Sequence, residues 1–210
     1  MIPYIAWFDY AGVALFAATG ALTASRKQLD IMGFFFLAIL TGVGGGTVRD
    51  LILDVPVFWV QQQAYLVVCM ATAVGVYFTA HLVESRYHVL LWLDAVALSV
   101  YAVVGAHKGL QLTGSPFVAI MTGAMTGTLG GILRDVLAGE PNAVTHKEIY
   151  ITATVLGAAS YVVMRMAGFP VFADAAIGGL VAFTARAGAI RFGWAMPPYR
   201  SRPGRPADMP

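Results

Sequence analysis

The feature that most constrains this chain is the length of its uncharged apolar runs. Residues 55–80, for example, contain no Asp, Glu, Lys or Arg. A helix needs about 20 apolar residues to cross the hydrocarbon core of a bilayer, so runs of this length predict membrane-spanning helices. Composition agrees, because only 11% of the residues are charged, against about 25% in an ordinary soluble domain. The expected fold class is an all-α membrane protein.

The same rule predicts seven transmembrane helices. They are expected at residues 5–24, 31–53, 60–82, 90–107, 116–138, 148–166 and 171–190. The last span is the weakest, because Asp174 and Arg186 interrupt its apolar run. The residues before the first span lack the positive charge of a cleavable signal peptide, so this segment is expected to remain as a span.

The distribution of Lys and Arg predicts the orientation, because cations in short loops are retained in the cytoplasm. The loops after spans one, three and five, together with the C-terminal end, contain Arg26, Lys27, Arg86, Lys147, Arg186, Arg191, Arg200, Arg202 and Arg205. The opposite side contains Lys108 and Arg165. The N-terminus should therefore lie outside and the C-terminus in the cytoplasm. Residues 193–210 are expected to form a basic, disordered tail, and their lack of an aromatic pattern argues against nucleic-acid binding.

An internal match at an offset of 85 residues indicates a duplication. The matched pairs include Trp7 with Trp92, Asp9 with Asp94, Gly20 with Gly105, Arg49 with Arg134, Asp50 with Asp135, Pro56 with Pro141 and Tyr65 with Tyr150. Each copy, residues 1–84 and residues 85–168, contains three predicted spans, so the second copy must enter the membrane in the opposite direction. Residues 169–192 form a seventh helix outside this symmetry. Transporters with inverted repeats place their permeation site near the midplane, at the repeat interface.

Glycine clusters in spans two and five are the first candidate site. The residues are Gly44, Gly45 and Gly46 in the first copy and Gly130 and Gly131 in the second. Each glycine costs a helix about 1 kcal/mol relative to alanine, so the clusters predict a kink or a short unwound turn that lines a pore. The alternative is close helix packing, because Gly42-x-x-x-Gly46 and Gly127-x-x-x-Gly131 both fit the pattern of small residues four apart.

Charged residues beside these clusters are the second group of candidates. They are Arg49, Asp50, Arg134, Asp135, Asp9 and Asp94. An intramembrane arginine costs at least ~2.5 kcal/mol unless it is paired, near the interface or in a watery cavity, and it is a functional candidate by default. The expected partners of the arginines are Asp9 and Asp94, or Asp50 and Asp135 across the repeat axis. Such pairs either line the pore or serve only as buried structural ion pairs.

Threonines near the clusters could add hydroxyl ligands along such a path. These are Thr41, Thr47, Thr126 and Thr128. In membrane helices, however, threonine more often bonds a carbonyl of its own helix, and we favour this second interpretation.

Catalytic and metal-binding motifs are absent from the sequence. It has no His-Glu-x-x-His, no Gly-x-Ser-x-Gly and no phosphate-binding Gly-x-x-x-x-Gly-Lys, so an enzyme is not expected. The single cysteine, Cys69, excludes a disulfide framework. His81, His88, His107 and His146 fall at predicted loop edges without paired ligand spacing, so neither a metal nor a cofactor is expected.

The duplicated three-span unit, the sequence Gly-Gly-Gly-x-x-Arg-Asp, its counterpart in span five and a seventh span together resemble the prokaryotic branch of the trimeric intracellular cation (TRIC) channel family. Matching bacterial sequences are also labelled a glycine transporter-like domain. The resemblance covers residues 5–190 and implies a homotrimer in which each protomer encloses its own pore. It also implies that helices two and five line this pore, which conducts potassium and other monovalent cations. Two departures are Leu129, where a third glycine would stand, and Thr47-Val48, where animal members have Lys-Glu.

The expected function is a passive, potassium-permeable channel of the bacterial inner membrane. A secondary transporter of a small solute such as glycine is the alternative, because a helix amide end near an arginine suits a carboxylate. A nonconducting structural membrane protein is a third possibility.

Overall fold

The computed structural model describes residues 3–83, 85–140 and 149–197, and this part of the chain is helical. Its elements are α1 (Pro3–Arg26), α2 (Ile31–Ile52), α3 (Phe58–Gln61), α4 (Ala64–Thr79), the 3₁₀-helix η1 (Ala80–Leu82), α5 (Arg86–Thr113), α6 (Pro116–Leu137), α7 (Ile151–Met166) and α8 (Val171–Phe192). The expected all-α fold class is confirmed, and each predicted span coincides with a helix.

Five stretches of the described residues are helical, long and apolar enough to cross a membrane. They are α2, α4 with η1, α5, α6 and α8. The apolar helix α7 is shorter, at 16 residues, and α1 has 24 residues. The span predicted as weakest is among the five, as α8. The two charged residues that interrupt its apolar run, Asp174 and Arg186, are buried. A count of seven crossings stays a prediction.

Several predicted boundaries were wrong. Helix α5 is longer than the predicted span 90–107: it begins after Ser85, whose side chain accepts from the backbone amide of His88, and it ends at Gly114 in the left-handed region with φ of 66°. His88 and His107 therefore lie inside a helix and not at loop edges. The predicted span 60–82 begins too early, because residues 58–61 form the separate short helix α3 and α4 begins at Ala64.

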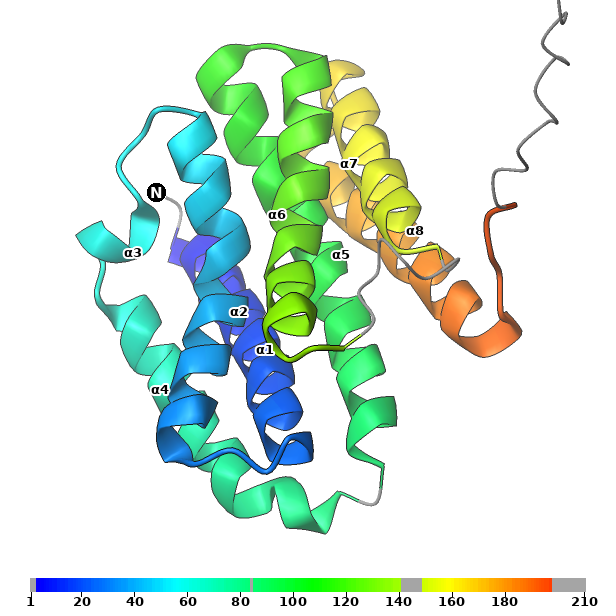
Figure 1. Ribbon diagram of the computed structural model, residues 1–210. Coiled ribbons are helices and arrows are strands. Elements are labelled where there is room, and N and C mark those ends of the chain that lie inside the picture. The colour runs from blue at the N-terminus through cyan, green and yellow to red at the C-terminus, as the bar shows by residue number, and fades with distance from the viewer. Residues whose placement is uncertain (1–2, 84, 141–148, 198–210) are drawn as a thin grey trace, which may run out of the picture.

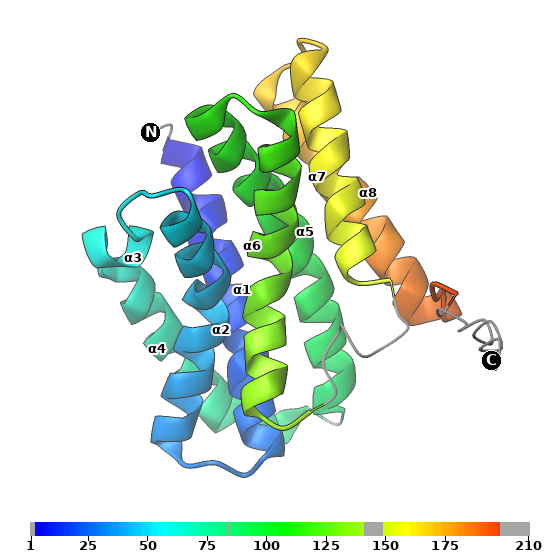
Figure 2. The ribbon, with the colours of Figure 1, turned by 45° about the horizontal axis from the view of Figure 1, so that its top comes forward.

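Helices α2 and α6 lie side by side and antiparallel in the middle of the bundle (Figures 1 and 2). Helices α1 and α5 lie behind them, with α4 on one flank and α7 and α8 on the other. Helix α1 packs against α2, α4 and α5, whereas α8 packs mainly against α7 and α5. The largest buried cluster combines apolar residues of α1, α2, α4 and α5, such as Phe16, Leu37, Cys69 and Leu98.

Of the kink or unwound turn predicted at the glycine clusters, the unwound turn is wrong, because α2 and α6 are α-helical throughout. The kink stays a prediction. Glycine is instead required by the approach of the two backbones. A Cβ on Gly45 would overlap the carbonyl oxygen of Thr126, and a Cβ on Gly130 would lie 2.5 Å from the carbonyl oxygen of Thr41. Close packing, the alternative interpretation of the sequence, therefore explains this pair.

The two contacts at this crossing are equivalent in the repeat, since Gly45 and Thr41 correspond to Gly130 and Thr126. The neighbouring crossings repeat the pattern. A Cβ on Gly20 would meet the carbonyl oxygen of Leu37, and one on Gly105 would meet the carbonyl oxygen of Thr122, 85 residues further on in both cases. The internal sequence match therefore corresponds to matched backbone contacts.

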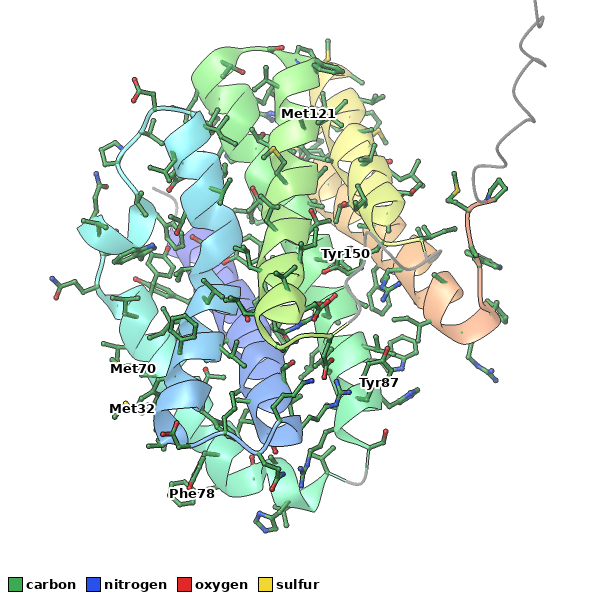
Figure 3. The ribbon with its side chains drawn as sticks, viewed as in Figure 1. Met32, Met70, Phe78, Tyr87, Met121 and Tyr150 are labelled. Atoms are coloured by element: carbon green, nitrogen blue, oxygen red, sulfur yellow. The ribbon has the colours of Figure 1, made fainter. Side chains whose placement is uncertain are left out.

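The outer surface of the bundle is apolar. Met32, Met70 and Phe78 project from it with exposed fractions of 65%, 38% and 67% (Figure 3). Contiguous apolar surface of this kind is unfavourable in water and marks contact with lipid or protein. The exterior is therefore that of a membrane protein.

A matched pair of glycine variants tests the packing interpretation. Gly45→Ala should lower the thermal unfolding temperature, because forcing a methyl group into a filled contact typically costs about 1–3 kcal/mol. Gly75→Ala in α4 is the control, because a Cβ there would meet nothing within 4 Å and alanine gains up to about 1 kcal/mol in a helix. The measurement is thermal unfolding in detergent, and equal effects of the two variants would contradict the interpretation.

Candidate functional site

The threonine hydroxyls near the α2–α6 crossing bond their own helices. Thr41 and Thr47 donate to the carbonyl oxygens of Leu37 and Val43 at 2.6 and 2.7 Å. Thr126 and Thr128 donate to those of Thr122 and Ala124 at 2.5 and 2.7 Å. The favoured interpretation is confirmed for all of them. Each hydroxyl oxygen keeps acceptor lone pairs, and that of Thr47 accepts from Nε1 of Trp59 at 2.9 Å.

The end of α2 carries a buried charge cluster centred on Asp50. Its Oδ1 accepts from Nε of Arg49 at 2.7 Å and from Nζ of Lys108 at 2.8 Å. Its Oδ2 accepts from the backbone amide of Phe58 at 3.0 Å. Asp50 is fully buried, so two cations and an amide compensate for the loss of water around its carboxylate. The sequence predicted only that Lys108 lies on the outer side of the membrane, because no local spacing relates it to Asp50.

Asp9 is held by two tyrosines rather than by an arginine. Its Oδ2 accepts from the hydroxyl of Tyr65 at 2.7 Å, and its Oδ1 accepts from that of Tyr101 at 3.1 Å. Within the described residues, no ion pair joins Arg49 to Asp9 or to Asp135, and Arg49 pairs with its neighbour Asp50. Both expected partners of Arg49 were therefore wrong. The internal match of Tyr65 with Tyr150 was the sequence feature that could have identified Tyr65 as part of this site.

The equivalent arginine in α6 has the expected partner. Nη1 of Arg134 lies 3.0 Å from Oδ1 of Asp94 and donates to Oγ1 of Thr19 at 2.8 Å. Its Nε donates to Asp135 at 2.8 Å. The predicted pair of Arg134 with Asp94 is confirmed, whereas a pair across the repeat axis with Asp50 is wrong. Because Arg134 and Asp94 are both buried, removing either partner would leave an uncompensated charge.

An open cavity of about 670 Å³ lies at the end of the bundle where α2, α5 and α7 end. We call it the vestibule. Its wall includes Asp9, Arg49, Val104, His107, Lys108 and Arg165. The glycines Gly44, Gly45, Gly46, Gly130 and Gly131 are not part of the wall, so their role in lining a pore stays a prediction.

The cations of the vestibule pair with buried carboxylates. Asp50 lies behind Arg49 and Lys108, and Asp174 lies 3.7 Å from Nη1 of Arg165. Asp174 is fully buried in the first turn of α8, where the helix dipole favours an anion. The formal charges around the vestibule are thus nearly balanced, although the exposed cations outnumber the exposed carboxylates. Arg49 was predicted as a pore or ion-pair candidate, whereas Lys108 and Arg165 were predicted only as orientation signals.

Part of the sequence-based interpretation lies outside the described residues. This concerns Pro141, His146, Lys147 and residues 198–210 of the predicted tail.

Comparison with known proteins places these features in a family. The family model described as "Glycine transporter" matches residues 6–81 and 91–166. The two segments are displaced by 85 residues, as 91 − 6 and 166 − 81 show. This displacement equals the offset of the internal sequence match.

Curated relatives and solved structures match most of the chain. The UPF0126 inner membrane protein YadS of Escherichia coli strain K12 is 37% identical over 202 residues, which cover 92% of this chain and 95% of YadS. A UPF0126 membrane protein of Vibrio cholerae is 36% identical over 91% of this chain and 81% of its own length.

Among solved structures, the TRIC channel orthologue from Rhodobacter sphaeroides is 48% identical with a TM-score of 0.88, covering 91% of this chain and 99% of that one. A prokaryotic TRIC channel in 0.5 M KCl is 26% identical with a TM-score of 0.86, covering 93% and 100%. With a family model that matches more than half of its residues and relatives that match nearly its whole length, this chain belongs to the prokaryotic TRIC family, whose family model carries the description "Glycine transporter".

Proposed function

We propose that the protein is a passive channel for potassium and other monovalent cations in the bacterial inner membrane. The observation that carries this proposal is the match to the TRIC cation channel orthologue of R. sphaeroides, at 48% identity and a TM-score of 0.88. The E. coli relative is an inner membrane protein. The assembly proposed is a homotrimer with one pore in each protomer.

The proposed pore runs between α2 and α6, past Gly44, Gly45, Gly46, Gly130 and Gly131. Support comes from the vestibule, whose wall reaches Arg49 of α2, three residues after the first glycine cluster. The hydroxyl oxygens of Thr41 and Thr126 lie beside Gly20 of α1 and Gly105 of α5, and they retain lone pairs that suit a cation. The proposed path passes the backbone contact at Gly45 and Gly130, where no side chain of these two residues stands between the helices.

The proposed domains are an inverted pair of three-helix repeats, residues 1–84 and 85–168, with a seventh helix at 169–192 and a basic cytoplasmic tail at 193–210. The antiparallel course of α2 and α6 and their matched glycine contacts support this division. The seven crossings put the N-terminus outside, as the cation distribution predicts.

Carboxylates and arginines beside the path set its electrostatics. Within the repeat cores, Asp9, Asp50, Asp94 and Asp135 outnumber Arg49 and Arg134, which permits cation passage. At the vestibule, Lys108 also pairs with Asp50 and brings the charges there close to balance. In this proposal, the pairs around Arg49 and Arg134 are parts of the pore and not only scaffolding, because one of them borders the vestibule.

A transporter of a small zwitterion such as glycine is the second candidate, and the vestibule wall favours it. Lys108 and Arg165 suit a carboxylate, whereas Asp9 suits an ammonium group. The family description "Glycine transporter" points the same way.

Planar-bilayer recording under a potassium chloride gradient tests the channel. Wild-type protein should give discrete currents that reverse near the potassium potential. Gly45→Leu should abolish them, because the side chain would occupy the α2–α6 contact, whereas Gly75→Leu should leave them unchanged because Gly75 faces open space. Silence from well-folded wild-type protein would contradict the channel.

Counterflow of labelled glycine into proteoliposomes tests the second candidate. If the vestibule binds the carboxylate, uptake should be saturable and should be lost in Lys108→Ala. Arg191→Ala is the control, because Arg191 is an exposed cation at the far end of α8. An uptake rate equal to that of empty liposomes would exclude glycine as the substrate.

A further inference from the structure

The wall of the vestibule collects polar side chains from two helices. His107, Lys108 and Gln111 line it from α5, and Arg165 lines it from α7. Residues three or four positions apart are neighbours on a helix, so the three residues of α5 share one face. The ends of α5 and α7 lie at the same end of the bundle (Figure 1). One cavity therefore brings together two cations, a histidine and a side-chain amide.

Most of the N–H donors in this wall are not used within the described residues. There, Nζ of Lys108 donates one hydrogen bond, to Asp50 at 2.8 Å, although an ammonium group has three N–H donors. Nη1 of Arg165 lies 3.7 Å from Oδ2 of Asp174, which is too far for a hydrogen bond. In the same part of the chain, the amide of Gln111 makes no hydrogen bond. The wall therefore offers several N–H groups to a ligand.

The carboxylates near the vestibule are less available than its cations. Asp50 and Asp174 are fully buried. Asp9 lies on the wall, but its two oxygens accept from the hydroxyls of Tyr65 and Tyr101. The cavity therefore presents more free donors than free acceptors. A ligand with several acceptor oxygens complements such a surface.

The two cations are present in the second repeat only. The counterparts of Lys108 and Arg165, 85 residues earlier, are Thr23 and Ala80, and both counterparts are buried. The three-helix unit therefore forms without cations at these positions. A cation in a membrane-spanning helix is costly and is a functional candidate by default, so the vestibule cations need a role beyond support of the fold.

We propose that the vestibule is a binding site for a tetrahedral oxyanion of the phosphate or sulfate class. Lys108 and Arg165 bind its oxygens from α5 and α7, and the amide of Gln111 adds a neutral donor. Helix α8 begins at Val171 on the same wall, so its dipole also favours an anion there. Four oxygens use more of the free donors than the two oxygens of a carboxylate do.

Binding of an oxyanion is compatible with a path for cations. Three cations and three carboxylates border the vestibule or pair with its wall, so their formal charges cancel. A bound divalent anion makes the vestibule negative, and a negative mouth attracts cations. The anion is thus a bound ligand and not the conducted ion. Its effect on cations rests on the proposed channel, whereas its binding does not.

Equilibrium dialysis of the full-length protein in detergent against radiolabelled sulfate, at fixed ionic strength, tests the site. Wild-type protein should bind sulfate saturably, with one ion per chain. Lys108→Gln and Arg165→Gln should each weaken the affinity by about tenfold, because each removes a charge-assisted hydrogen bond. Arg191→Gln is the control and should bind like the wild type, because Arg191 is an exposed cation at the far end of α8.

Arg165→Gln and Gln111→Ala carry the decision, because Lys108 also compensates the buried Asp50 and its loss affects the fold as well. Gln111→Ala should weaken the affinity by about threefold, since it removes a neutral hydrogen bond. Thermal unfolding without sulfate checks that both variants are folded. Absence of saturable binding by the wild type, or an unchanged affinity of folded Arg165→Gln, would overturn the proposal. Dialysis measures no current, so it separates failure of this site from failure of the proposed channel.

The phosphate of a lipid headgroup carries the same chemistry, and displacement of the labelled sulfate distinguishes the two sources. The competitors are inorganic phosphate and a short-chain phosphatidylglycerol, each at the same ionic strength as a chloride control. Displacement by inorganic phosphate identifies the ligand as a free anion. Displacement by the lipid at lower concentrations identifies it as a headgroup, and both results support the oxyanion site. Displacement by chloride as effective as that by phosphate would overturn the oxyanion class.

Discussion

The contact between the backbones of α2 and α6 is the constraint on which the rest of the structure depends. Gly45 and Gly130 each face a carbonyl oxygen of the other helix, at a distance that leaves no room for a Cβ. In a membrane, where lipid competes for apolar side chains, such close approach supplies the packing that holds helices together. Each helix has its Arg-Asp sequence near its C-terminal end. Because α2 and α6 are antiparallel, the two sequences lie at opposite ends of the bundle.

The positions of the two arginines follow from this arrangement, and each arginine needs partners that compensate for its buried charge. Arg134 has Asp94, Asp135 and Thr19 as partners, whereas Arg49 shares Asp50 with Lys108. Arg134, Asp94 and Thr19 are buried, whereas the cluster of Arg49 borders an open vestibule. A duplicated sequence has therefore produced two charge clusters of different geometry.

The sequence predicted the helices well because hydrophobic length is a local property. The start of α6 at Pro116 and the end of α2 near Ile52 agree with prediction, since Ser115 and the residues before Pro56 mark the boundaries. The internal repeat also identified the contacting glycines. Their consequence could not be decided from the sequence, because a glycine cluster permits both a break and a close contact, and the position of the partner helix decides between them.

The partners of charged groups were less predictable, because they depend on contacts between distant segments. The Arg134–Asp94 pair was expected from the repeat, but the repeat implied an equal pair of Arg49 with Asp9, which the structure lacks. The two copies differ at single residues. The hydroxyl of Thr19 accepts from Arg134 and that of Tyr101 donates to Asp9, whereas the equivalent residues of the other copy, Val104 and Phe16, have no hydroxyl. Lys108 and Asp174 pair with residues that are distant in the sequence, so no local spacing predicts these pairs.

The most direct test of the central claim, that the backbone contact between α2 and α6 sets the arrangement of the bundle, is a crystal structure of the Gly45→Ala variant. The account predicts that α2 lies farther from α6 than in the wild type, because a Cβ at position 45 would overlap the carbonyl oxygen of Thr126. An unchanged distance between the two helices would contradict it.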